Sequence, residues 1–122
     1  MRVLVVGAGG VGGWYGGVLA RNGEEVTLLA RGDHLRAIRN NGLRVKSEVS
    51  GDFTVHPMAT DEPDGSWQAD LALFCVKGYH NVQAIKAMAP AVGDNTDVLT
   101  LQNGIGAGAE LAEAFGDEKV IL

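Results

Sequence analysis

The sequence predicts an α/β domain with a doubly wound, mainly parallel sheet, helices on both faces and a short β-hairpin insertion. Two observations carry this prediction. Apolar, β-branched runs alternate with segments of helical spacing along most of the chain, which is typical of parallel strands joined by crossover helices. A glycine-rich turn joins the first such run to the first helical segment. The length of 122 residues fits one domain, for which about 100–200 residues is usual.

The first third of the chain is predicted to fold as strand, helix and strand. Residues 2–6 are apolar at nearly every position, as in a central parallel strand that is buried on both faces. Residues 11–22 follow with helical spacing, and Gly23 fits the position just past a helix end. Residues 26–30 are a second apolar run and predict the second strand.

The next segment is predicted to add a short helix and the hairpin. Asp33 fits the N-cap of a helix that runs to about residue 40, and Gly42 fits its C-terminal stop. Residues 43–49 and 53–58 alternate apolar and polar side chains around a Ser-Gly-Asp turn. This alternation predicts a β-hairpin, or a pair of short strands, inserted after the second helix.

The rest of the chain continues the alternation of strands and helices. The predicted elements are strands at residues 70–76 and 97–101 and helices at residues 81–88 and 107–115. Right-handed crossovers between these strands place helices on both faces of the sheet. Residues 120–122 begin a further strand where the chain stops, so we expect the chain to be a fragment of a larger protein.

Composition and charge exclude several classes of protein. The chain is 46% hydrophobic and 20% charged, with a net charge of -5, so we expect neither disorder nor a broad basic face for nucleic acid. Glycines interrupt the apolar N-terminal segment, so it predicts neither a membrane span nor a signal peptide, and we expect a cytoplasmic protein. Cys75 is the single cysteine and lies inside an apolar run, which excludes an internal disulfide and predicts a buried, inert thiol. His34, His56 and His80 lack the spacing of metal ligands.

The glycine-rich turn matches the pattern G-x-G-x-x-G of dinucleotide-binding domains. Its residues are Gly7, Ala8, Gly9, Gly10, Val11 and Gly12. The pattern is weak alone, but here it follows a predicted strand and opens a predicted helix, which is the context that it requires. Gly7 would allow a tight turn, Gly9 the close approach of a pyrophosphate, and Gly12 close packing of helix on strand. With the positive end of the helix, the turn predicts a Rossmann-type dinucleotide site; the alternative is a glycine-rich helix packed on strands without a ligand.

Arg31 stands at the end of the second predicted strand, where an NAD-binding domain usually has Asp or Glu about 20 residues past the motif. A guanidinium favours a 2′-phosphate through paired, charge-assisted hydrogen bonds. We therefore expect NADP(H) as the cofactor. Two alternatives stay open on the sequence: Arg31 is a solvated loop cation, or a shift in register brings Asp33, Glu24 or Glu25 into the site.

Polar side chains also follow the later predicted strands. Lys77 comes directly after residues 70–76, and Asn103 comes just after residues 97–101. Ligands of open α/β sheets lie beyond the carboxyl ends of the strands, so Lys77 is a candidate partner for a phosphate or the nicotinamide half, and Asn103 for ribose hydroxyls or substrate. A solvated lysine and an Asn-Gly turn are the alternatives. His80 fits the mouth of the same cleft or the surface of a helix.

Four segments combine these features. They are GAGGVGGWYGGVLARNG at residues 7–23, LLARGDHLRAIRNNGLRV at 28–45, FCVKGYH at 74–80 and LQNGIG at 101–106. Taken together and in this order, they resemble the N-terminal domain of the ketopantoate reductase (2-dehydropantoate 2-reductase) family. The glycine turn is shared with many dehydrogenases, whereas the VK and QNG elements after the later strands are more specific.

The resemblance implies an NADPH-dependent reduction of 2-ketopantoate to pantoate, a step in pantothenate biosynthesis. It also implies that Arg31 contacts the 2′-phosphate and that Lys77 and Asn103 border the cofactor and the substrate. The family's general-acid lysine and substrate-binding carboxylate belong to a following helical domain. We therefore expect residues 1–122 to be an NADP-binding domain without a catalytic residue of its own.

The partners expected from the resemblance are a small 2-keto acid and the helical domain that follows, with a homodimer left open. No nucleic acid and no membrane is expected among them. Two other functions fit the same residues: another NADP-dependent 2-keto or 3-hydroxy acid reductase, and a non-catalytic module that senses a dinucleotide. Lys77 and Asn103 favour an enzyme, because a pure sensor does not need polar groups at the nicotinamide end.

Overall fold

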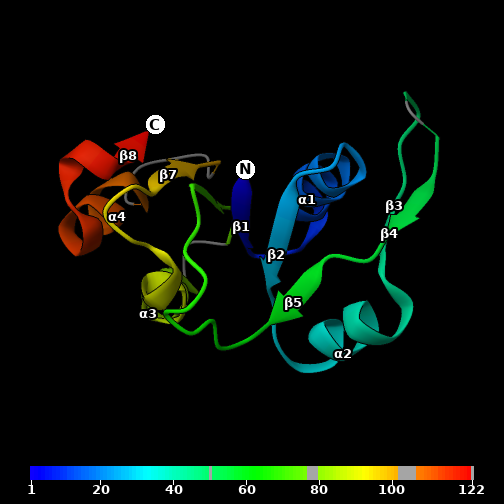
Figure 1. Cartoon of the computed structure of the whole chain (residues 1–122), viewed down its shortest axis with the longest axis horizontal. Coiled ribbons are helices and arrows are strands. Elements are labelled where there is room, and N and C mark those ends of the chain that lie inside the picture. Colours follow the sequence, from blue (N-terminus) through cyan, green and yellow to red (C-terminus); the bar gives the residue numbers. More distant parts are fainter. Residues whose placement is uncertain (50, 77–79, 102–106, 122) are drawn as a thin grey trace.

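A parallel sheet forms the centre of the molecule (Figure 1). The computed structural model describes residues 1–49, 51–76, 80–101 and 107–121. Within these ranges the sheet has six strands, which in spatial order are β5 (Met58–Thr60), β2 (Glu25–Leu29), β1 (Arg2–Val6), β6 (Leu71–Phe74), β7 (Asp97–Thr100) and β8 (Val120–Ile121). Every neighbouring pair is parallel. The chain winds from β1 first to one side and then to the other, so the predicted doubly wound sheet is confirmed.

Helices cover both faces of this sheet (Figure 1). The helices are α1 (Gly10–Arg21) and α2 (Gly32–Asn41) on one face and α3 (Asn81–Met88) and α4 (Ala107–Phe115) on the other, with short 3-10 helices η2 (Ala89–Ala91) and η3 (Asp117–Lys119). Because successive side chains of a strand point to opposite faces, β1 supplies both cores: Val3 and Val5 pack in one, and Leu4 and Val6 in the other. In the described part of the chain, no helix combines the length and apolarity that crossing a membrane requires.

The start of α2 differs from the sequence prediction. Asp33 was expected to be the N-cap, but Arg31 occupies that position, and Asp33 lies in the first turn of the helix. Gly32 has a φ of +64°, a backbone conformation open to glycine, and this lets the chain turn from β2 into the helix earlier than expected. Gly42 ends the helix with a φ of +81°, as its predicted role as a stop requires.

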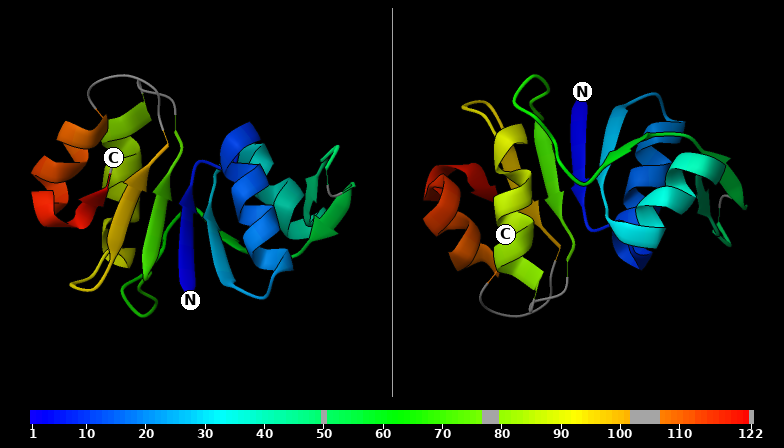
Figure 2. Two further views of the ribbon diagram at one scale, coloured as in Figure 1. Left: turned by 90° about the horizontal axis from the view of Figure 1, so that it is seen from above. Right: turned by 90° about the horizontal axis from the view of Figure 1, so that it is seen from below.

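The predicted hairpin is present. Strands β3 (Leu43–Val45) and β4 (Phe53–Val55) pair antiparallel. They lie beyond α1, away from the main sheet (Figure 2). The guanidinium of Arg21 lies 4.7 Å from the centre of the Phe53 ring, so the hairpin closes over the outer side of α1.

Both arms of the hairpin are shorter than the sequence predicted, and the first ends at Val45 instead of residue 49. Residues 53–58 were expected to form one strand, but β4 ends at Val55 and Met58 begins β5, which pairs parallel with β2 in the main sheet. Pro57 separates the two strands; proline has no N–H to donate to a ladder, so it interrupts the pairing. Local alternation predicts a strand but not the sheet that it joins, and this is why the expectation was wrong here.

Candidate functional site

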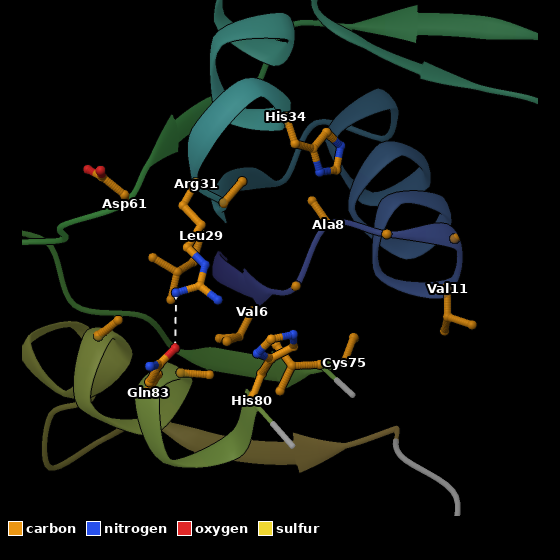
Figure 3. A pocket seen from close by; sticks show the side chains of 17 residues that line it. Val6, Ala8, Val11, Leu29, Arg31, His34, Asp61, Cys75, His80 and Gln83 are labelled. Carbon is orange, nitrogen blue, oxygen red and sulfur yellow. Dashed lines mark hydrogen bonds between the residues drawn. The ribbon is translucent and has the colours of Figure 1, made fainter. Parts of the chain in front are cut away.

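A cleft of about 630 Å³ opens at the carboxyl ends of the central strands. Its floor includes Val6 at the end of β1, Leu29 at the end of β2 and Cys75 just after β6 (Figure 3). The strand order reverses here, because the chain leaves β1 toward β2 whereas β6 lies on the other side of β1. This topological switch point is where open α/β sheets bind their ligands.

The glycine-rich turn forms one wall of the cleft. Gly7 has a φ of +92°, a conformation that L side chains rarely adopt, so the chain can reverse sharply after β1. A Cβ on Gly12 would overlap the carbonyl oxygen of Gly7 and would lie 3.2 Å from Cβ of Cys75. Gly12 therefore allows α1 to start directly against the ends of β1 and β6.

Gly9 and Gly10 have different surroundings from Gly12. A Cβ on either residue would meet no protein atom within 4 Å, and Gly9, the N-cap of α1, has an ordinary φ of -72°. Neither packing nor backbone strain requires glycine at position 9, whereas close approach by a ligand would require it. The first turn of α1 contains no acidic residue, and its N–H groups have no partner within the helix. A diphosphate therefore fits this wall, at the positive end of the helix.

Arg31 stands at the opposite wall. Its backbone is extended at the N-cap of α2, with φ -149° and ψ 165°. Its Nη1 donates a hydrogen bond of 3.1 Å to Oε1 of Gln83 on α3. Among the described residues, no carboxylate forms an ion pair with this guanidinium. An exposed cation at the rim of an apolar-floored cleft is suited to an anionic group of a bound ligand.

The acids considered as alternatives to Arg31 lie elsewhere. Asp33 does not line the cleft, and its exposed side chain forms an ion pair with Arg36 on the same helix. Glu24 pairs with the N-terminal ammonium, and Glu25 opens β2 at the end far from the cleft. Because the register of β2 is set along five residues by β1, a shift that would bring an acid into the position of Arg31 is excluded.

His80, the N-cap of α3, lines the cleft, which is one of the two positions that the sequence left open for it. One face of α3 lines the cleft beside it through Gln83, Ala84 and Ala87, which follow helical spacing and which the sequence did not single out. The two alanines leave room beside the apolar floor, and Gln83 reaches Arg31. His34, from the first turn of α2, also lines the cleft. His34 could have been found from its offset of three residues from Arg31, whereas the position of Gln83 follows only from the crossover that brings α3 to the same cleft as the end of β2.

Cys75 lies on the floor of this cleft and is partly buried. Burial raises the pKa of its thiol from the ordinary value of 9.0 to about 11, because a low-dielectric environment disfavours the thiolate. The thiol is therefore protonated near neutral pH and is a poor nucleophile. No group of three or more His, Cys, Asp or Glu in the described ranges could hold a metal ion.

Two predicted site residues, Lys77 and Asn103, lie outside the described residues. Their assignments to the nicotinamide half and to the substrate stay predictions. The described residues before these segments are Val76, which lines the cleft, and Leu101, which follows β7.

Comparisons with known proteins agree with this geometry. A family model described as ketopantoate reductase PanE/ApbA matches residues 3–122. The 2-dehydropantoate 2-reductase of Halobacterium salinarum is 39% identical over 123 residues, which cover 100% of this chain and 40% of that protein. A solved PanE/ApbA family ketopantoate reductase from Ralstonia eutropha JMP134 has a TM-score of 0.86 and 43% identity over 95% of this chain and 39% of that one.

A structural neighbour with a different name covers the same residues. D-mandelate dehydrogenase, solved with NADH and anilino(oxo)acetate, has a TM-score of 0.88 and 25% identity over 98% of this chain and 39% of that one. The chain thus spans about 40% of the length of the relatives that it matches.

Proposed function

The chain belongs to the PanE/ApbA ketopantoate reductase family, and on this premise we propose that it is the NADP(H)-binding domain of an enzyme that reduces 2-ketopantoate to pantoate. The observation that supports the proposal best is one cleft lined by both the glycine turn and Arg31. Family membership alone would leave the cofactor undecided, because the similar D-mandelate dehydrogenase was solved with NADH.

Residues on the two walls of the cleft would bind different parts of the cofactor. The first turn of α1 would hold the diphosphate through backbone N–H groups and the positive helix end. Arg31 would bind the 2′-phosphate through paired, charge-assisted hydrogen bonds. Lys77 and Asn103 are the proposed partners of the nicotinamide half and the substrate. When bound, NADPH supplies the hydride that reduces a keto carbonyl.

No residue of this chain is proposed as the general acid. The resemblance assigns that role to a lysine of a following helical domain, which also contains the substrate-binding carboxylate, and the chain spans about 40% of its relatives' length. We therefore expect the purified chain to bind NADPH weakly and to show no turnover of 2-ketopantoate when NADPH oxidation is followed by absorbance. Turnover by the chain alone would contradict this division of roles.

The substitution Arg31→Ala tests the cofactor assignment. Calorimetric titration of the chain should show NADPH bound more tightly than NADH. Arg31→Ala should weaken NADPH by about tenfold or more, the usual effect of losing hydrogen bonds to a charged group, and should leave NADH nearly unchanged. Arg44→Ala is the matched control, because Arg44 is an exposed arginine of β3 that does not line the cleft. Equal losses of affinity for both cofactors, or no loss for either, would contradict the assignment of Arg31 to the 2′-phosphate.

A second candidate is an NADH-linked reductase of other 2-keto acids, favoured by the similarity to D-mandelate dehydrogenase over 98% of the chain. The two candidates differ in a measurable way. The second one requires wild-type affinity for NADH to equal or exceed that for NADPH, and an enzyme containing this chain to reduce aromatic 2-keto acids faster than 2-ketopantoate. Arg31 favours the first candidate, because NADH has no 2′-phosphate for the guanidinium to bind.

A further inference from the structure

We propose that Gln83 is a positioning and specificity-determining residue: its neutral amide holds the Arg31 guanidinium at the cleft without compensating its charge. This inference rests on the proposed function, because it concerns the selection of the 2′-phosphate at the same site. It concerns a side chain of α3, far in sequence from the glycine turn and from the end of β2 that mark the dinucleotide site.

The contact joins two elements that are distant in sequence. Nη1 of Arg31 donates to Oε1 of Gln83 at 3.1 Å, across 52 residues of chain. Figure 3 shows the two side chains meeting at one side of the cleft, one from the β2–α2 junction and the other from α3. Both residues are exposed, so an arginine side chain without this partner would sample many rotamers in solvent. Ordering such a side chain costs conformational entropy, and a guanidinium that is already held avoids part of this cost on binding.

The neutrality of Gln83 is what makes the contact useful. A guanidinium has five N–H donors, so one bond to an amide oxygen leaves donors and the full positive charge for a phosphate. A carboxylate at the same position would hold Arg31 through an ion pair, and its negative charge would lie beside the 2′-phosphate when the cofactor binds. Like charges at such short range oppose binding.

The positions of the nearby acidic side chains also leave the charge of Arg31 uncompensated. Asp33 is engaged by Arg36. Asp61 lines the cleft, but its carboxylate points away from Arg31 (Figure 3). The described partner of Arg31 is therefore an amide, in a region where two carboxylates are directed elsewhere.

The substitution Gln83→Glu tests the inference, because it keeps the side-chain length and an acceptor oxygen but adds a charge. The probes are 2′,5′-ADP and 5′-AMP, which differ in the 2′-phosphate and avoid the nicotinamide end. Calorimetry of the 122-residue chain should show 2′,5′-ADP weakened by about tenfold or more, as expected when a charged hydrogen-bond partner is lost, and 5′-AMP by less than about twofold. Val82→Glu is the matched control, since Val82 is 61% exposed on the same helix and does not line the cleft.

Gln83→Leu separates positioning from charge. It should weaken 2′,5′-ADP by about twofold to fivefold in the wild-type background, a loss equivalent to one modest hydrogen bond, and should have no effect when Arg31 is already alanine. An equal effect in both backgrounds would mean that Gln83 acts independently of Arg31. Urea unfolding of each variant checks that the affinities refer to folded protein.

The outcomes separate this inference from the proposed function. If the wild-type chain binds 2′,5′-ADP no better than 5′-AMP, the proposed NADP(H) site is wrong. If the wild type prefers 2′,5′-ADP and Gln83→Glu behaves like Val82→Glu, the site stands and the inference about Gln83 is wrong.

Discussion

Two groups of glycines within one turn and helix have opposite surroundings. A Cβ on Gly12 would overlap the carbonyl oxygen of Gly7, and a Cβ on Gly17 would overlap Cγ2 of Val45. A Cβ on Gly9 or Gly10 would meet no protein atom within 4 Å. The first group lets α1 fit between the sheet and the hairpin, whereas the second leaves bare backbone at the cleft. A single glycine-rich segment therefore serves two separate purposes, one in packing and one in binding.

The packing group explains why glycine is tolerated inside α1. Each interior glycine costs a helix about 1 kcal/mol relative to alanine. Gly16 faces the sheet, where a Cβ would lie 3.0 Å from Cδ2 of Leu28 and 3.3 Å from Cγ2 of Val5. Close approach of the helix to buried strands on one side and to the hairpin on the other offsets this cost through burial of apolar surface.

Substitution of Gly12 should have the largest effect on stability. Gly12→Ala places a methyl group against the backbone carbonyl of Gly7, which cannot move away as a flexible side chain could. We therefore expect a loss of about 3 kcal/mol or more in the free energy of unfolding, at the upper end of overpacking effects. Urea denaturation followed by circular dichroism measures this loss. A variant as stable as the wild type would show that α1 does not need close contact with β1.

Gly17→Ala should have an intermediate effect. The new methyl group displaces Val45 of the hairpin, and we expect a net loss of about 1 kcal/mol after the gain in helix propensity is counted. In a Val45→Ala background the overlap is relieved, so the same substitution should become neutral or stabilising by up to about 1 kcal/mol. The double-mutant cycle is measured by urea denaturation, and equal costs in both backgrounds would contradict the contact.

Gly9→Ala should have the smallest effect on stability and a clear effect on binding. We expect the free energy of unfolding to change by less than about 0.5 kcal/mol, as for surface substitutions away from packed contacts. The methyl group stands where the diphosphate approaches, so NADPH and NADH should both weaken, by about tenfold. This differs from Arg31→Ala, which should affect NADPH alone. Unchanged affinity for both cofactors in calorimetric titration would remove Gly9 from the site.

The sequence was sufficient to place the glycine turn and Arg31 at the carboxyl ends of the strands, because both signals are local. The turn is recognised from a strand, a fixed glycine spacing and a helix, all within residues 2–21. Arg31 is identified by its offset from that motif, and pairing of β2 with β1 sets its position at the strand end. The apolar runs also determined the alternation of strands and helices, since burial on both faces of a parallel sheet requires them.

Only the tertiary structure decided which distant residues meet. Met58–Thr60 resembles the end of a hairpin strand in sequence, yet it joins β2 at the edge of the main sheet. Gln83 carries no local signal of function, and it reaches Arg31 because the crossover after β6 places α3 along the cleft that the end of β2 also lines. Sequence patterns report the burial and backbone geometry of neighbouring residues, whereas contacts between elements depend on how the strands are ordered across the whole sheet.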